Sequence, residues 1–121
     1  MAKLVADAVL DAALGYIETN GILLTVCNAA VTTYAGASST NKLADVAIDG
    51  DDMAIADDTS GRKLTISQQA TMTVDASGTA SHIAICSSDA LLYVTTCTEQ
   101  ALTAGNTVTV PAWKISIADP T

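Results

Sequence analysis

The sequence predicts an all-β fold of the β-sandwich or jelly-roll-like kind, with one N-terminal α-helix. Three observations lead to this prediction. From Arg62 onward, apolar residues repeat at a spacing of two, which is the period of half-buried strands. Compact turns that carry Gly, Ser and Asn separate these apolar runs. Only residues 4–19 place their apolar residues at helical spacing instead.

The predicted helix over residues 4–19 has one clear apolar stripe, formed by Leu10, Leu14 and Ile17. Four further residues widen this stripe and are expected to join the core: Ala6, Val9, Ala13 and Tyr16. The acidic residues of the segment lie off the stripe. Asn20-Gly21 follows as a C-terminal stop signal.

Two short strands are expected next, Ile22–Cys27 and Ala30–Tyr34, with Asn28 between them as a kink or a bulge. Residues 35–61 are predicted to be an irregular acidic loop region. Within it, Lys42–Ile48 is compatible with either a helical turn or a short strand. Since a connection of this length is unusual in a compact domain, we expect the region to be functional or mobile.

Residues 62–118 form the strand-rich part. The alternation predicts six strands, at residues 62–67, 70–75, 80–87, 91–97, 106–110 and 112–118. Asp75–Thr79 and Ala104–Asn106 have the composition of tight turns. Pro111 has no N–H for a sheet ladder, so it is expected at a strand start, a bulge or an edge.

Length and composition favour a single soluble domain over residues 1–121. A chain of 121 residues can bury a core without disulfides or metal. Mean hydropathy is +0.38, yet no segment reaches the ~20 apolar residues that span a bilayer. Asp7 and Asp11 interrupt the apolar run that a signal peptide needs, so synthesis in a cytoplasm is expected. The net charge of −8 opposes binding to phosphate backbones and excludes nucleic acid as a predicted partner.

The three cysteines, Cys27, Cys86 and Cys97, are expected to be small buried residues. Their odd number and their spacing fit neither a disulfide framework nor a metal knuckle. The alternative is that bridges form after release into an oxidising environment, either between Cys86 and Cys97 on neighbouring predicted strands or through one unpaired thiol.

The sequence contains no convincing metal or cofactor site. An acidic cluster suggests calcium, but from Asp49 the EF-hand positions for Gly and Glu hold Ala54 and Ser60. A solvated acidic loop is the preferred interpretation, with a looser oxygen-ligand site as the alternative. No Gly-rich phosphate-binding loop is present. We therefore expect no metal and no cofactor.

His82 is the only histidine, and it suggests a Ser-His-Asp arrangement with Ser81 and either Asp75 or Asp89. Adjacent residues on a strand point to opposite faces, so Ser81 is expected to lie out of reach of the His82 ring. No G-x-S-x-G motif is present either. The sequence therefore predicts a protein that is not an enzyme.

Trp113 shares its strand face with Ile115 and Ile117 on the parity of their positions. We therefore expect it in the core, with an interface anchor beside Pro111 as the alternative.

Three stretches resemble a pattern found in small structural proteins of tailed bacteriophages: Thr73–Ile85 (TVDASGTASHIAI), Leu91–Thr98 (LLYVTTCT) and Ala101–Ile117 (ALTAGNTVTVPAWKISI). That pattern places a "DGTATHVAL" strand–turn–strand before "LLYV" and an "AGN" or "AGD" turn before the last strand. Further positions along the chain also resemble such a protein: Tyr34, Leu43–Val46 and Ser60–Leu64. The pattern carries turns and core positions, so it implies a virion β-module but no binding residues. Cys86 and Cys97 depart from it.

Two function classes follow from this resemblance. The first is a head-decoration (cement) protein, expected as a homotrimer on the outer face of the major capsid protein lattice. The second is a tail, baseplate or fibre-associated virion protein. A small adhesion or carbohydrate-binding module is more distant, because few aromatic residues are available to stack on sugars. In either of the first two classes the protein is located in the virion.

We expect the partner contact in the region 35–61 together with the N-terminal residues, because that region is too long for a hairpin and poor in bulky apolar residues. Its polar contacts would weaken with salt. The candidate interface residues are Ala2, Lys3, Leu4, Lys42, Asp49, Asp51, Asp52, Asp57, Asp58 and Arg62.

Overall fold

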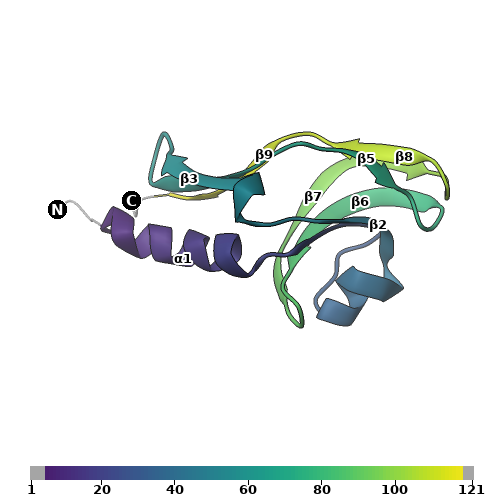
Figure 1. Ribbon diagram of the computed structural model, residues 1–121, viewed down its shortest axis with the longest axis horizontal. Helices are drawn as coiled ribbons and strands as arrows, with labels where there is room; N and C mark the ends of the chain where they lie inside the picture. The colour runs from purple at the N-terminus through teal and green to yellow at the C-terminus, as the bar shows by residue number, and fades with distance from the viewer. Residues whose placement is uncertain (1–4, 119–121) are drawn as a thin grey trace.

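The computed structural model describes residues 5–118 and confirms a mainly β protein with a single N-terminal helix. Nine strands form three antiparallel sheets within these residues, in the orders β2-β1-β6-β7, β3-β4-β9 and β5-β8. Figure 1 shows the strands β3, β9, β5 and β8 in one layer, with α1 and the sheet of β2, β6 and β7 in the other. The main apolar core lies between these layers.

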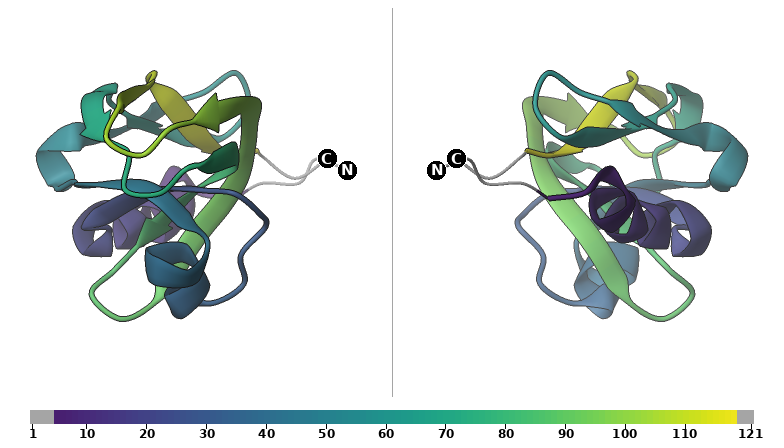
Figure 2. Two further views of the ribbon diagram at one scale, coloured as in Figure 1. Left: turned by 90° about the vertical axis from the view of Figure 1, so that its right-hand side faces the viewer. Right: turned by 90° about the vertical axis from the view of Figure 1, so that its left-hand side faces the viewer.

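Helix α1 spans Asp7–Asn20 and lies against the sheet of β3 (Met53–Asp57) and β4 (Arg62–Ile66), as the end-on views of Figure 2 show. The helix residues Leu10 and Leu14 are buried on the side that faces the sheet. The helix ends where Asn20-Gly21 predicts, and the Gly21 N–H donates to the Ile17 carbonyl at 2.7 Å. The helix therefore covers one face of this sheet.

The four-stranded sheet consists of β1 (Leu23–Cys27), β2 (Lys42–Ala47), β6 (Gly78–Cys86) and β7 (Leu91–Leu102). Strand β1 lies inside this sheet, and its residues from Leu24 to Cys27 are buried on both faces. On one face Leu24 and Val26 join the main core. On the other face Cys27 packs in a second, smaller apolar cluster with Ala84 and Cys86.

The segment between β1 and β2 covers this second face. The predicted strand Ala30–Tyr34 is wrong, because the segment instead ends in a helical turn, the π-helix Gly36–Thr40, and contributes Val31 and Ala37 to the smaller cluster. Asn28 lies in a bend directly after β1, in agreement with the kink expected of it, whereas the register shift between β1 and β2 falls earlier, between Val26 and Cys27. The Asn41 side chain donates to that of Asn28 at 2.9 Å, which ties the two ends together.

Residues 35–61 are not an irregular loop. They contain β2, the short 3-10 helix Gly50–Asp52 and β3, and their side chains Leu43, Ala44, Ile48 and Met53 are buried in the core. The strand alternative for Lys42–Ile48 is thus correct. The strand pattern is hard to recognise in the sequence because acidic residues occupy the solvent-facing positions and the turns. Only a few apolar residues of the segment point inward.

The other layer is built on a long two-stranded ribbon, with β3 paired to the outer edge of β4. Strand β4 continues into β5 (Gln69–Thr73), and β8 (Thr107–Val110) continues into β9 (Trp113–Ile117), with β4 paired to β9 and β5 paired to β8. Pro111 lies at the break between β8 and β9, outside both ladders, as its missing N–H requires. Five of the six predicted strands from residue 62 onward end within two residues of their predictions, and β7 runs to Leu102 rather than to residue 97.

Candidate functional site

Arg62 is held inside the protein by two carboxylates. At the start of β4 its Nε donates to Asp11 Oδ1 of α1 at 2.7 Å, and its Nη1 donates to Asp57 at the end of β3. Hydrogen bonds to Asp11 first and to Asp57 second raise the pKa of the guanidinium further above its usual range. Both Arg62 and Asp57 were predicted to contact a partner. The structure joins them to each other and to the helix, and a partner contact of either residue stays a prediction.

Asp58 occupies the turn after β3 and binds strand β9. Its carboxylate accepts hydrogen bonds from Ser116 Oγ at 2.7 Å, from Lys114 Nζ at 2.9 Å and from the Thr59 N–H at 2.9 Å. The Ser116 hydroxyl, followed by Lys114 and the Thr59 N–H, lowers the pKa of Asp58 well below its usual range. This residue therefore fastens the β3–β4 turn to the C-terminal strand.

Lys42 lies at the far end of the protein, at the start of β2. Its Nζ is 3.0 Å from Asp45 Oδ2 and 3.3 Å from Asp75 Oδ2. Partial burial lowers the pKa of the ammonium, but the hydrogen bonds and charges of Asp45 and Asp75 outweigh this effect and raise it overall. Lys42 thus ties β2 to the β5–β6 connection.

Asp49 and Asp52 cap their own 3-10 helix. The Asp49 side chain accepts from the Asp51 N–H at 2.9 Å, and the Asp52 side chain accepts from the Asp49 N–H at 3.0 Å. Asp49 and Asp51 remain exposed. Among residues 5–118, no three His, Cys, Asp or Glu side chains gather in a group that could hold a metal ion.

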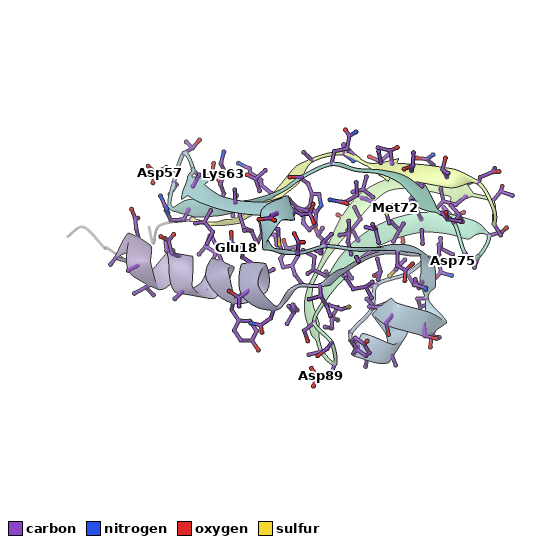
Figure 3. The ribbon with its side chains drawn as sticks, viewed as in Figure 1. Glu18, Asp57, Lys63, Met72, Asp75 and Asp89 are labelled. Carbon is purple, nitrogen blue, oxygen red and sulfur yellow. The ribbon has the colours of Figure 1, made fainter. Side chains whose placement is uncertain are left out.

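The predicted interface residues are therefore spread over the protein rather than brought together. Figure 3 shows Asp57 at one end of the long axis and Asp75, the partner of Lys42, toward the other. Ala2, Lys3 and Leu4 lie outside the described residues. The hypothesis of one long mobile loop at 35–61 is wrong. A contact between the exposed Asp49 or Asp51 and a partner stays a prediction.

Ser81 and His82 lie closer together than the alternation of a strand predicts. The Ser81 Oγ is 2.8 Å from His82 Nδ1, at the point where the register between β6 and β7 shifts. The expectation that these side chains diverge is wrong. Neither proposed acid completes a triad with them, since Asp75 pairs with Lys42 and Asp89 accepts from Ser87 Oγ in the β6–β7 turn. Figure 3 shows these two aspartates at separate corners of the protein.

All three cysteines are free thiols. Cys86 faces Leu91 at one end of the β6–β7 ladder, whereas Cys97 follows Thr96, which faces His82 near the middle of the ladder, so the alternative of a Cys86–Cys97 bridge is wrong. Cys27 and Cys86 are buried in the smaller cluster, as expected of structural cysteines. Burial raises the pKa of each of the three thiols, which keeps them protonated at neutral pH.

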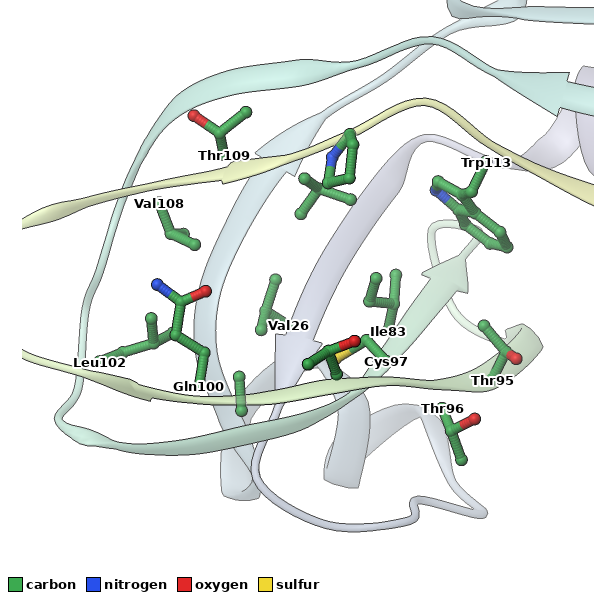
Figure 4. A pocket seen from close by; sticks show the side chains of 14 residues that line it. Val26, Ile83, Thr95, Thr96, Cys97, Gln100, Leu102, Val108, Thr109 and Trp113 are labelled. Atoms are coloured by element: carbon green, nitrogen blue, oxygen red, sulfur yellow. The ribbon is translucent and has the colours of Figure 1, made fainter.

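Trp113 packs against the main core, as its parity predicts, and also lines a cavity that the sequence did not reveal. Its ring stacks on Tyr93 of β7, with centroids 6.0 Å apart. The adjoining cavity has a volume of about 370 Å³ and lies between β7 and the β8–β9 segment (Figure 4). Its residues come from four distant stretches of the chain, so no local motif marks it.

The outer face of α1 carries apolar side chains that nothing in the described chain covers. Val9 is 61% exposed and Tyr16 is 62% exposed, and Ala8, Ala12 and Ala13 beside them are exposed as well. The expectation that Ala6, Val9, Ala13 and Tyr16 extend the core stripe is wrong, because the sheet contacts the helix from one side only. We call these outward residues, Ala8, Val9, Ala12, Ala13 and Tyr16, the α1 outer stripe.

The outer stripe was visible in the sequence as a helix with apolar residues on more than one face. Its acids, Asp7, Asp11 and Glu18, occupy one narrow arc, and apolar residues extend round most of the rest. This arrangement is typical of a helix covered on two sides. The prediction assigned all apolar residues to one core because a single sequence does not show which side the sheet covers.

Comparisons with known proteins give no match: the sequence fits no family model, and neither a curated protein nor a solved structure is significantly similar to the chain. None of the helices within residues 5–118 has the length and apolar character needed to cross a membrane.

Proposed function

We propose that this protein is a structural component of a tailed-bacteriophage virion, and that it is a decoration protein that binds the outer face of the capsid as a homo-oligomer. The observation that carries the proposal is the α1 outer stripe, a set of neighbouring apolar side chains on an otherwise acidic protein. Contiguous exposed apolar surface is typical of protein–protein contacts. The resemblance of the strand-rich part to small phage structural proteins supports the virion setting.

A second copy of this chain is the proposed partner of the outer stripe. Copies with a net charge of −8 repel one another, so they associate best through a surface that carries no charge. The outer stripe meets this condition, because Asp7, Asp11 and Glu18 lie on another arc of α1. Association here leaves the exposed Asp49 and Asp51 for contact with the major capsid protein.

Self-association is tested with two substitutions that add the same charge. Ala12→Glu places a carboxylate in the outer stripe, whereas Ala104→Glu places one in the exposed β7–β8 turn at the opposite end of the protein. Light scattering after size exclusion is expected to give an oligomer for the natural protein and for Ala104→Glu, and a monomer for Ala12→Glu. If the natural protein were a monomer at micromolar concentration, the outer stripe would not be a surface for self-association.

The virion role is tested separately by quantitative mass spectrometry of purified particles. Hundreds of copies per particle identify a decoration protein, whereas a few to some dozens identify the tail-associated alternative. Absence from particles contradicts both roles. Added purified protein should also bind particles that lack it, and the Ala12→Glu variant should bind them more weakly because it loses the multivalent attachment of an oligomer.

A further inference from the structure

The cavity beside Trp113 lies at an open seam between the two layers. Strand β7 pairs only with β6, and β8 pairs only with β5, so the facing edges of these two strands are not hydrogen-bonded to each other. Side chains of β1 and β6, including Val26 and Ile83, form the apolar floor between the two edges (Figure 4). The volume of about 370 Å³ lies within the range of small-molecule sites.

The cavity is apolar inside and uncharged throughout. Its buried lining consists of Val26, Ala80, Ile83, Leu102 and Val110. Threonines and Gln100 supply the exposed rim, and no Asp, Glu, Lys, Arg or His is part of the lining. Burial raises the pKa of the lining Cys97 thiol, so that group is neutral too. Because a buried charge needs a partner charge, the buried part of the lining disfavours a charged ligand group.

One polar atom of the lining has no partner. The Trp113 Nε1 is buried and has no hydrogen-bond acceptor within the described chain. Figure 4 shows this nitrogen on the edge of the indole that is turned toward the middle of the lining. A buried donor without an acceptor lowers stability, and most buried donors in native proteins are paired. Because Nε1 has almost no accessible surface, a ligand reaches this N–H only when the ring shifts toward the cavity, and it must then bring an acceptor to satisfy it.

We propose that the cavity is a binding site for an uncharged, largely apolar small molecule with a carbonyl oxygen, which accepts a hydrogen bond from Trp113 Nε1. The apolar floor supplies affinity by burying the body of the ligand. The indole N–H fixes its orientation and selects an acceptor over an isosteric hydrocarbon. This inference is independent of the virion role, since it rests on the cavity and on Trp113 alone.

Acetophenone and α-methylstyrene test the proposal, because they differ only in a C=O in place of a C=CH₂. Trp113 is the only tryptophan, so its indole N–H gives one assignable resonance in ¹H–¹⁵N spectra. Acetophenone is expected to bind saturably, to move that resonance downfield and to bind about tenfold more tightly than α-methylstyrene. The amides of β7 and β8 should shift with it.

Three variants separate the hydrogen bond from packing. Trp113→Phe removes the donor, so the two probes should then bind equally, as followed by the β7 and β8 amides. Tyr93→Phe keeps the stacked ring and should retain the tenfold preference. Val108→Phe fills the cavity and should abolish binding of both probes while the spectrum stays well dispersed. Failure of either probe to saturate, equal affinities in the natural protein, or shifts confined to other residues would overturn the proposal.

Discussion

Asp11 and Arg62 are 51 residues apart in the chain, yet the Arg62 Nε donates to Asp11 Oδ1 at 2.7 Å and its Nη2 donates to Asp11 Oδ2 at 3.3 Å. This two-point contact joins α1 to the first residue of β4. The Arg62 side chain is 18% exposed and also donates a hydrogen bond to Asp57. The guanidinium is therefore a link between the helix and the β3–β4 hairpin.

Arg62→Ala is expected to loosen the attachment of α1 to the sheet without unfolding the protein, because Leu10 and Leu14 still hold the helix. Amide hydrogen exchange should become faster in α1, and the difference should shrink at high salt. Lys63→Ala, at the neighbouring position, is the matched control, since no ion pair of Lys63 occurs within residues 5–118. Equal exchange in both variants would show that the Asp11–Arg62 contact does not hold the helix.

Gly61→Ala is expected to destabilise the protein much more than Gly105→Ala. Both glycines have positive φ, at 75° and 90°, which costs any other residue about 1–2 kcal/mol. A Cβ on Gly61 would also lie 1.9 Å from the Ile117 carbonyl oxygen, whereas a Cβ on Gly105 meets open space. Urea unfolding measures both. Similar losses in the two variants would mean that the β4–β9 ladder shifts easily to admit the methyl group.

Asp58→Asn is expected to reduce the sensitivity of the protein to acid. The pKa of Asp58 is lowered in the folded state. Below about pH 4 the Asp58 carboxylate is therefore protonated in the unfolded chain before it is protonated in the folded protein, and stability falls as the pH is lowered. The full contribution of the carboxylate is present above that pH and is lost as the pH approaches the folded pKa. Unfolding measured from pH 7 to pH 2 should fall less steeply for Asp58→Asn than for the natural protein.

Asp51→Asn is the matched control for that experiment, because the exposed Asp51 carboxylate accepts no hydrogen bond from the rest of the described chain. Its acid profile should follow that of the natural protein. Identical profiles for all three proteins would show that the Ser116 and Lys114 contacts of Asp58 do not persist in solution.

Trp113→Ala is expected to cost about 3 kcal/mol, near the lower end for a large aromatic residue, because the ring is only half-buried. The substitution removes the stack on Tyr93 and enlarges the adjoining cavity. Trp113→Phe keeps most of the packing and should cost less than about 1.5 kcal/mol. If Trp113→Ala unfolded as the natural protein does while particle binding was lost, Trp113 would be an interface anchor instead.

One thiol of three is expected to react with Ellman's reagent in the folded protein. Cys97 is half-buried at the cavity, whereas Cys27 and Cys86 are fully buried. Because burial raises the pKa of all three thiols, even the reaction of Cys97 should be slow. Cys97→Ser should remove it. Three reactive thiols before unfolding would contradict the packing of the smaller cluster.

The sequence by itself determined the class of the fold and most of its elements. Strands such as β8 and β9 alternate apolar and polar residues along their own length, and the helix ends at Asn20, where Asn20-Gly21 predicts its end. These relationships join residues that are close together in the chain, so a single sequence is enough to predict them. The same holds for Trp113, whose parity with Ile115 and Ile117 placed it against the core.

Only the tertiary structure decided which surfaces are free. Whether Tyr16 faces a sheet or solvent depends on where β3 and β4 lie, and whether Arg62 can reach a partner depends on Asp11, which is distant in the chain. The cavity arises because β7 and β8 face each other without pairing, and the Ser81–His82 contact lies where the register between β6 and β7 shifts. These features depend on which distant segments of the chain pair with each other. The local periodicity of the sequence does not determine that pairing.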